Sequence, residues 1–181
     1  MFEELLRKTA QVLDGASVPY VIMGGQAALL YGVVRVTQDI DVTLGVSAEE
    51  LPRVLLAVAE AGWRVLPENP ERFVAATNVL PLQDLESGIR LDLIFSFTPF
   101  EREAISRAIP VEVDGVSVAF VRLEDLVIFK VFAGRARDLE DVRALLLRHP
   151  EVNRAYIREW LGVMSEGAEA SFLERFDSIG S

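Results

Sequence analysis

Three aspartates occupy apolar segments of the sequence, and they are the residues best suited to chemistry. Asp39 and Asp41 are separated by one apolar residue within QDIDVTL, and Asp92 lies in a second apolar stretch, IRLDLIF. Residues two apart on a β-strand point to the same face, so Asp39 and Asp41 should project side by side. Like charges at that spacing repel each other, and near a core they also lose hydration. The pattern therefore predicts a positive group that balances these carboxylates.

A divalent hard cation would supply that positive charge. Mg²⁺ and Mn²⁺ prefer oxygen ligands, and Mg²⁺ commonly bridges carboxylates to substrate phosphates. Taken alone, the Asp-x-Asp pattern is equally consistent with a solvated strand face. A third aspartate in a separate apolar strand favours the metal site. We therefore predict that Asp39, Asp41 and Asp92 are the ligands of a divalent metal ion.

A glycine pair precedes these aspartates and is a candidate phosphate-binding loop. Gly24 and Gly25 follow an apolar run and precede a short helical stretch. Glycine lets the backbone approach a ligand closely, and the N–H groups at a helix start can hold an anion. A glycine pair is more often a tight turn, but here only a short helix separates it from Asp39. Arg35 and Thr37 add a cation and a hydroxyl at the same edge of the predicted sheet.

Apolar periodicity and turn residues indicate the elements that must position these groups. The predicted helices cover Phe2 to Leu13, Gln26 to Tyr31, Ser47 to Ala61, Pro99 to Ala108, Leu123 to Phe132, Asp138 to Arg148 and Asn153 to Met164, with a last segment around Phe172. The predicted strands cover Val18 to Met23, Gln38 to Leu44, Asn78 to Leu85, Ile89 to Phe95, Val111 to Val113 and Val116 to Val121. The order of these elements predicts an α+β fold with an α/β core, in which helices flank a mixed β-sheet and a helical part follows.

Composition excludes several classes of protein. The 181 residues are 51% hydrophobic and 25% charged, which is typical of a globular chain with one substantial core. No apolar run is long enough for a membrane span, the acidic N-terminus is unlike a signal peptide, and the absence of cysteine excludes disulfides and thiolate metal sites. The net charge of −10 argues against an extended nucleic-acid surface. We therefore expect a cytoplasmic protein that does not bind membranes.

The chain resembles the polymerase-β-like nucleotidyltransferase superfamily in the order of its elements. A strand leads to the glycine pair and a short helix, the next strand carries Asp-x-Asp, and a later strand carries the third aspartate. The stretch GGQAALLYGVVRVTQDIDVTL, from Gly24 to Leu44, is similar to the first motif of the AbiEii-type nucleotidyltransferase toxins. The stretch EDLVIFKVFAGRARDLEDV, from Glu124 to Val142, is similar to the K…R-x-(K/R)-D-x-x-D signature of that branch. The resemblance covers about residues 18–148. It implies a palm domain at residues 1–121 and a helical part at 122–181 packed on the palm.

The resemblance also implies roles for the residues of the first motif. Gly24 and Gly25 match the loop that cradles the nucleoside triphosphate, and Asp39 and Asp41 match the two metal ligands. Asp92 matches the third carboxylate, which assists deprotonation of the attacking group. The sequence departs from the pattern at Gly25, where serine is commoner, and this removes one hydroxyl contact to phosphate.

The second motif implies roles for three further residues. Lys130 matches a lysine that contacts the triphosphate, and Asp138 and Asp141 match the acidic pair downstream of it, with Arg137 in place of the usual lysine. Read from the residues alone, Lys130 either extends to solvent from an apolar helix or serves a site, and in both cases stays partly hydrated. The two aspartates share a helix face, where they are either charges near the helix N-terminus or members of an ion-pair network with neighbouring arginines.

The function that this resemblance implies is enzymatic. A metal-dependent nucleotidyltransferase would transfer a nucleoside monophosphate from an NTP to an acceptor hydroxyl by two-metal catalysis. The acceptor would be an RNA 3′ end, a protein or a small molecule, and a cognate toxin or antitoxin is a further candidate partner. Two alternatives stay open: a non-catalytic nucleotide-binding or protein-interaction module of the same fold, and an antitoxin that nucleotidylates its partner toxin.

Overall fold

The structure is a computed structural model that describes residues 1–34, 36–166, 168 and 171–179. The chain divides into two compact units, which we describe separately. Unit 1 comprises Met1–Gln26 and Val36–Val121, and unit 2 comprises Ala27–Arg35 and Arg122–Ser181. Helix α2 (Gly24–Leu30) begins in unit 1 and continues into unit 2.

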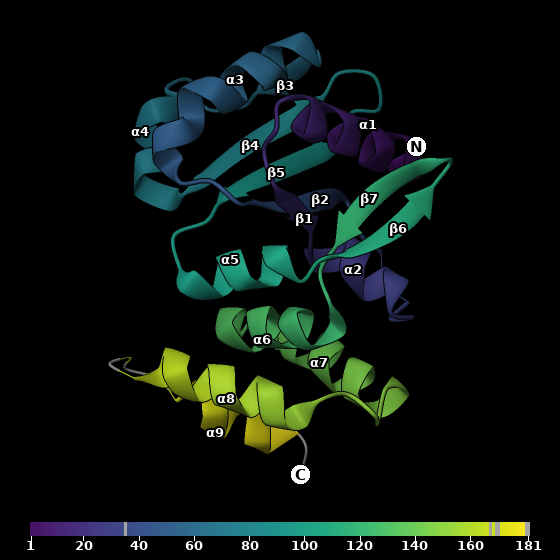
Figure 1. The fold of residues 1–181 in the computed structure, drawn as a ribbon, viewed down its shortest axis with the longest axis vertical. Helices are drawn as coiled ribbons and strands as arrows, with labels where there is room; N and C mark the ends of the chain where they lie inside the picture. The colour runs from purple at the N-terminus through teal and green to yellow at the C-terminus, as the bar shows by residue number, and fades with distance from the viewer. Residues whose placement is uncertain (35, 167, 169–170, 180–181) are drawn as a thin grey trace. The chain divides into compact units, whose positions relative to one another are not determined.

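Unit 1 is built on a mixed β-sheet (Figure 1), which in the described part of the chain has seven strands in the order β3-β4-β5-β2-β1-β7-β6. β2 pairs with β5 and β1 with β7 in parallel, and the other neighbours are antiparallel. The strands are β1 (Tyr20–Ile22), β2 (Asp39–Leu44), β3 (Trp63–Val65), β4 (Val79–Asp84), β5 (Arg90–Phe95), β6 (Ile109–Val113) and β7 (Val116–Phe120). The predicted mixed sheet is confirmed.

Helices flank this sheet, as the sequence predicts. α1 contacts β6 and β7, α3 contacts β3, α4 contacts β4, and α5 contacts β1 and β2. These helices are α1 (Phe2–Gly15), α3 (Leu51–Glu60), which follows the 3-10 turn η1 (Ala48–Glu50), α4 (Pro70–Thr77) and α5 (Pro99–Ser106). No helix in the described ranges combines the length and apolar composition needed to cross a membrane.

Three elements of unit 1, β3, α3 and α4, differ from the sequence prediction. β3 and α4 lie in a segment for which no element is predicted. The sequence pattern of Ser47 and Glu50 resembles a capping box at the start of the helix predicted from Ser47, but Ser47 precedes the 3-10 turn and makes no side-chain cap bond. The α-helix proper begins at Leu51, which places Pro52 in its first turn, where proline costs no backbone hydrogen bond.

Unit 2 contains the predicted helical C-terminal part, and its helices pack against one another. They are α6 (Leu123–Ala133), α7 (Ala136–Arg148), α8 (Arg154–Ser165) and α9 (Phe172–Ile179). Gly134 ends α6 in a left-handed conformation, with φ 64°. Arg175 of α9 donates a hydrogen bond of 2.7 Å to the Val131 carbonyl, so it caps the last turn of α6.

An ion pair links α1 to the sheet and makes stability depend on pH. Lys8 Nζ lies 2.6 Å from Asp84 Oδ1, and Ser87 donates two hydrogen bonds to Asp84 Oδ2. Burial raises the pKa of Asp84, but the bonds from Lys8 and Ser87 outweigh it and lower the pKa to about 2. Because the folded-state pKa lies below that of the unfolded chain, this stabilisation is present at neutral pH and is lost as pH falls from about 5 toward 2.

We therefore expect Asp84→Asn to lower the free energy of unfolding at pH 7 by about 2 kcal/mol. It should also flatten the fall of stability in acid, because the group that titrates is gone. Urea unfolding at neutral and acidic pH measures both effects. Asp114→Asn is the control, since Asp114 is an exposed turn residue with φ 47°, a conformation that asparagine tolerates. Equal losses in the two variants would contradict the assignment.

Candidate active site

The parallel pairing of β2 with β5 brings the three predicted aspartates together. Asp41 lies opposite Asp92 in this pairing, and Asp39 lies opposite Arg90. One carboxylate oxygen from each of Asp39, Asp41 and Asp92 lies within 4.8 Å of the other two, and all three residues are half-buried. The intervening residues point to the opposite face, where Ile40 is fully buried. The apolar alternation thus forms the core on one face and presents the carboxylates on the other.

Arg90 provides a positive charge for this cluster within the protein itself. Its Nε donates a hydrogen bond of 2.9 Å to Asp92 Oδ1. The bond to Asp92 raises the pKa of the guanidinium, and the nearby charges of Asp39 and Asp41 raise it further. Sequence reasoning missed this residue, although its place two before Asp92 in IRLDLIF puts it on the same strand face.

Gly24 makes room for one of the carboxylates. Its φ of +60° is in the left-handed region, and a Cβ built there would overlap Asp41 Oδ2 and lie 2.7 Å from Asp41 Cγ. The Met23 N–H donates a hydrogen bond of 2.9 Å to the Asp41 carbonyl, which holds this turn against β2. A glycine at position 24 is therefore required by both the backbone conformation and the Asp41 side chain.

We expect Gly24→Ala to displace the Asp41 carboxylate and to weaken Mn²⁺ binding about tenfold or more, since one carboxylate ligand moves. The left-handed backbone should cost a further 1–2 kcal/mol or so of stability. Mn²⁺ titration and thermal unfolding measure the two effects. Gly15→Ala is the matched control, because a Cβ at Gly15 meets no atom within 4 Å. Wild-type Mn²⁺ affinity in Gly24→Ala would show that Asp41 tolerates the added methyl group.

Three further residues are predicted to lie near the aspartates: Gly25, Arg35 and Thr37. Thr37 accepts a hydrogen bond of 3.0 Å from Gln26 Nε2, so the segment that leads into β2 is tied to α2. Gly25 is buried in the first turn of α2. Arg35 lies outside the residues that the structure describes.

Lys130, Asp138 and Asp141 meet inside unit 2. Lys130 Nζ lies 2.6 Å from Asp141 Oδ2 and 3.5 Å from Asp138 Oδ1. Lys130 is only 4% exposed, so the predicted partly hydrated lysine is wrong. Burial raises the pKa of Asp138, but a hydrogen bond from Arg135 and the charge of Lys130 outweigh it and lower the pKa. For Asp138 and Asp141, the sequence left two interpretations open: charges near a helix N-terminus, or members of an ion-pair network. The contacts with Lys130 and Arg135 support the ion-pair network.

Solved structures share this fold at low sequence identity. An antigenic nucleotidyltransferase-like protein from Paracoccidioides brasiliensis is 16% identical, with a TM-score of 0.59 over 97% of this chain and 91% of that one. The antibiotic-resistance factor ANT(2'')-Ia in solution is 20% identical, with a TM-score of 0.57 over 91% of this chain and 95% of that one. ANT(2'')-Ia in complex with adenylyl-2''-tobramycin is 18% identical, with the same TM-score over 99% and 98% of the two chains. These similarities show a nucleotidyltransferase fold.

The sequence itself matches a family over most of its length. No curated protein sequence matches the chain. Residues 2–153, which include the three aspartates, Lys130 and Asp138, match the family described as nucleotidyltransferase of unknown function (DUF6036). The chain therefore belongs to the DUF6036 family of nucleotidyltransferases.

Proposed function

We propose that the protein is an enzyme that transfers a nucleoside monophosphate from an NTP to an acceptor hydroxyl. One observation carries the proposal: Asp39, Asp41 and Asp92 meet within 4.8 Å on paired strands of a nucleotidyltransferase fold. In the step, the acceptor oxygen bonds to the α-phosphorus, and the bond from that phosphorus to the α–β bridging oxygen breaks. Pyrophosphate leaves, and the acceptor hydroxyl releases its proton to Asp92.

The cluster suits a hard divalent cation, since it offers three carboxylates and no nitrogen or sulfur ligand. Asp39, Asp41 and Asp92 would hold Mg²⁺ or Mn²⁺. When bound, two such ions would neutralise charge on the phosphates and acidify the acceptor hydroxyl. Arg90 orients Asp92 through its 2.9 Å bond, and Gly24 keeps space for the Asp41 carboxylate.

The nucleotide side of the proposal uses residues that the resemblance assigns. Gly24 and Gly25 would approach the triphosphate through their backbone, and Arg35 and Thr37 would contribute a cation and a hydroxyl to its binding. Lys130 would share its ammonium between a phosphate and Asp141, and Asp138 would orient it. We also propose that the protein belongs to the AbiEii-type branch and acts in a toxin–antitoxin pair. The support for this is the sequence spacing of Lys130, Asp138 and Asp141, which resembles the second motif of that branch.

A second candidate function is a non-catalytic nucleotide-binding module. The observation that favours it is the engagement of Lys130, which is buried and bonded to Asp141 at 2.6 Å. A lysine held in this way is less available to stabilise the charge of a transition state, whereas the backbone N–H groups at the start of α2 could still hold the phosphates. This candidate predicts NTP binding that persists when divalent metal is removed.

Calorimetry with each NTP, with and without Mn²⁺, tests the proposal against this alternative. We expect tight NTP binding only with metal, its loss in the Asp39→Ala/Asp41→Ala double variant, and slow metal-dependent release of pyrophosphate, in which water takes the place of the acceptor hydroxyl and nucleoside monophosphate is the other product. Equal NTP binding by wild type and double variant would overturn the proposal. Metal-independent binding without pyrophosphate release would identify the non-catalytic module.

A further inference from the structure

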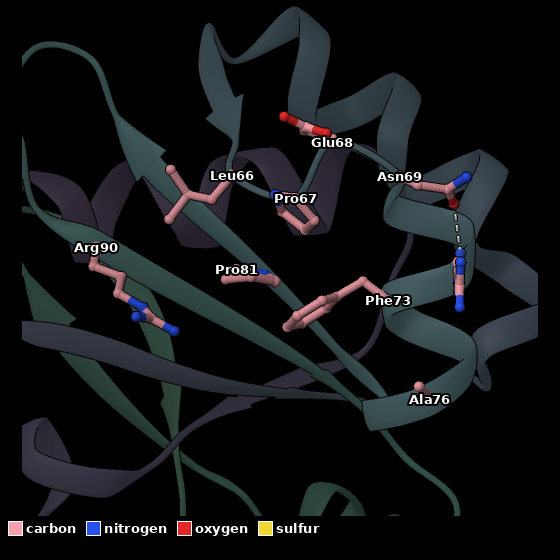
Figure 2. A pocket seen from close by; sticks show the side chains of 9 residues that line it. Leu66, Pro67, Glu68, Asn69, Phe73, Ala76, Pro81 and Arg90 are labelled. Atoms are coloured by element: carbon pink, nitrogen blue, oxygen red, sulfur yellow. Dashed lines mark hydrogen bonds between the residues drawn. The ribbon is translucent and has the colours of Figure 1, made fainter.

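A pocket opens on unit 1 between α4 and the sheet, with a volume of about 660 Å³ (Figure 2). That volume lies within the range of about 300–1,000 Å³ that is usual for small-molecule sites. Four elements contribute to its wall: the connection from β3 to α4, helix α4 and strands β4 and β5. The side chains that matter below are Leu66, Phe73, Ala76, Pro81 and Arg90.

The pocket wall exposes apolar side chains from helix α4 and from the segment after β3. Phe73 extends from α4 toward the sheet and is 39% exposed, and Leu66 is 40% exposed. Pro81 on β4 lies beside them, and Pro67 completes the apolar wall. The ring faces of phenylalanine and proline are flat and apolar, and they pack well against another ring. Exposed apolar side chains gathered in a concave site indicate a ligand with an apolar face.

The pocket adjoins the acidic cluster through the register of the sheet. Pro81 lies directly opposite Asp92 in the antiparallel pair β4–β5, and such partners have Cα atoms about 5 Å apart. Asp92 in turn lies opposite Asp41. Arg90 lines the pocket and also donates to Asp92, so one side chain belongs to both sites. In a molecule that rests on Pro81, the end that faces strand β5 would therefore lie next to the Asp92 carboxylate.

We propose that this pocket binds the acceptor, and that the acceptor is a small molecule with a flat apolar ring and a hydroxyl group. This inference rests on the proposed function. The ring would lie on Phe73 and Pro81, and the hydroxyl would point to Asp92, which takes its proton as the oxygen bonds to the α-phosphorus and pyrophosphate leaves. The wall carries two arginines, Arg72 and Arg90, whose charges are offset by Glu68 and by Asp92, the partner of Arg90. The chain as a whole has a net charge of −10, which disfavours a polynucleotide acceptor.

The probe for this pocket is 4-nitrophenyl β-D-glucoside, which combines an aromatic ring with hydroxyl groups, and glucose is the control ligand without the ring. Binding is measured by saturation-transfer NMR without nucleotide. The blocking variant is Ala76→Trp, which places a large side chain in the pocket from an exposed position of α4. Its matched control is Ala75→Trp, because Ala75 is equally an exposed residue of α4 but lines a different hollow.

We expect the glucoside to bind wild type and Ala75→Trp alike, and Ala76→Trp about tenfold more weakly or not at all. Phe73→Ala should weaken it as well, and glucose should not bind. Equal binding to wild type, Ala76→Trp and Phe73→Ala, or no binding to wild type, would overturn the inference. A short single-stranded RNA that displaces the glucoside would also overturn it, because the acceptor would then be an RNA end.

Titration with Mn²⁺ alone separates this inference from the proposed function, and we expect wild type, Ala75→Trp and Ala76→Trp to bind Mn²⁺ equally. If Mn²⁺ binds and the glucoside does not, the acceptor inference is wrong and the proposed function stands. If the glucoside binds in the pocket and Mn²⁺ does not bind, the proposed function is wrong, and the acceptor role is overturned with it.

Discussion

Asp41→Asn should lower metal-dependent pyrophosphate release at least about 1,000-fold, since metal stabilisation of transition-state charge is worth several kcal/mol. The amide keeps the shape of the carboxylate, so the close fit against Gly24 survives. What changes is the charge, and with it the affinity for a divalent cation. Asp39→Asn should have the same effect, because both residues contribute an oxygen to the cluster.

The same variants should not destabilise the metal-free protein. Three carboxylates within 4.8 Å repel one another, and removing one charge relieves that repulsion. We therefore expect an unchanged or higher melting temperature for Asp39→Asn and Asp41→Asn without metal. The control for activity is Glu112→Gln, which removes one negative charge from an exposed position on the edge strand β6 and leaves the three aspartates unchanged. A clear fall in the melting temperature of both variants would show that the pair serves the fold.

Arg90 offsets part of the negative charge of the three aspartates from within the protein. Its bond to Asp92 and its position opposite Asp39 supply a positive charge in the folded protein. The sequence predicts that such a group is needed, but it does not identify Arg90, because the choice depends on which residues of β2 and β5 face each other. Register between strands distant in sequence is set by the packing of the whole sheet. The contact between Gly24 and Asp41 could not be predicted either, because it too depends on how distant segments pack in the folded sheet.

The strands that carry the aspartates were predictable because their local signals are strong. Polar and apolar residues alternate from Arg90 to Leu93 in β5. The β6–β7 hairpin elsewhere in the sheet was predictable as well, because Asp114 and Gly115 adopt the positive φ that a two-residue hairpin turn requires. α4 was missed although Asn69 caps it by accepting a hydrogen bond from the Arg72 N–H, and Pro70 occupies its first turn. The preceding strand, β3, is only three residues long, too short for a periodic signal. α4 and the segment that follows β3 form much of the wall of the pocket beside Asp92, so that pocket could not be predicted either.

Lys130→Met should lower the free energy of unfolding by about 3–5 kcal/mol, the usual cost of removing one partner of a buried ion pair. The substitution removes the 2.6 Å bond to Asp141, whose side chain is 7% exposed, and the weaker contact with Asp138. The sequence-based expectation is different: a partly hydrated lysine whose loss costs little stability and weakens NTP binding by roughly 1–3 kcal/mol. Urea unfolding at pH 7 and NTP titration with Mn²⁺, on the same variant, distinguish the two.

Two further variants identify the cause of the destabilisation. Lys130→Met/Asp141→Leu removes both charges, so most of the lost stability should return, because neither partner is left buried with an uncompensated charge. Arg135→Met is the control, since Arg135 bonds to Asp138 at 2.6 Å but its side chain is 79% exposed, and such a pair contributes at most about 1 kcal/mol. A Lys130→Met protein that unfolds like wild type yet binds NTP poorly would contradict the structural role. The ammonium would then serve the nucleotide, as the resemblance implies, and Asp141 would only hold it in place.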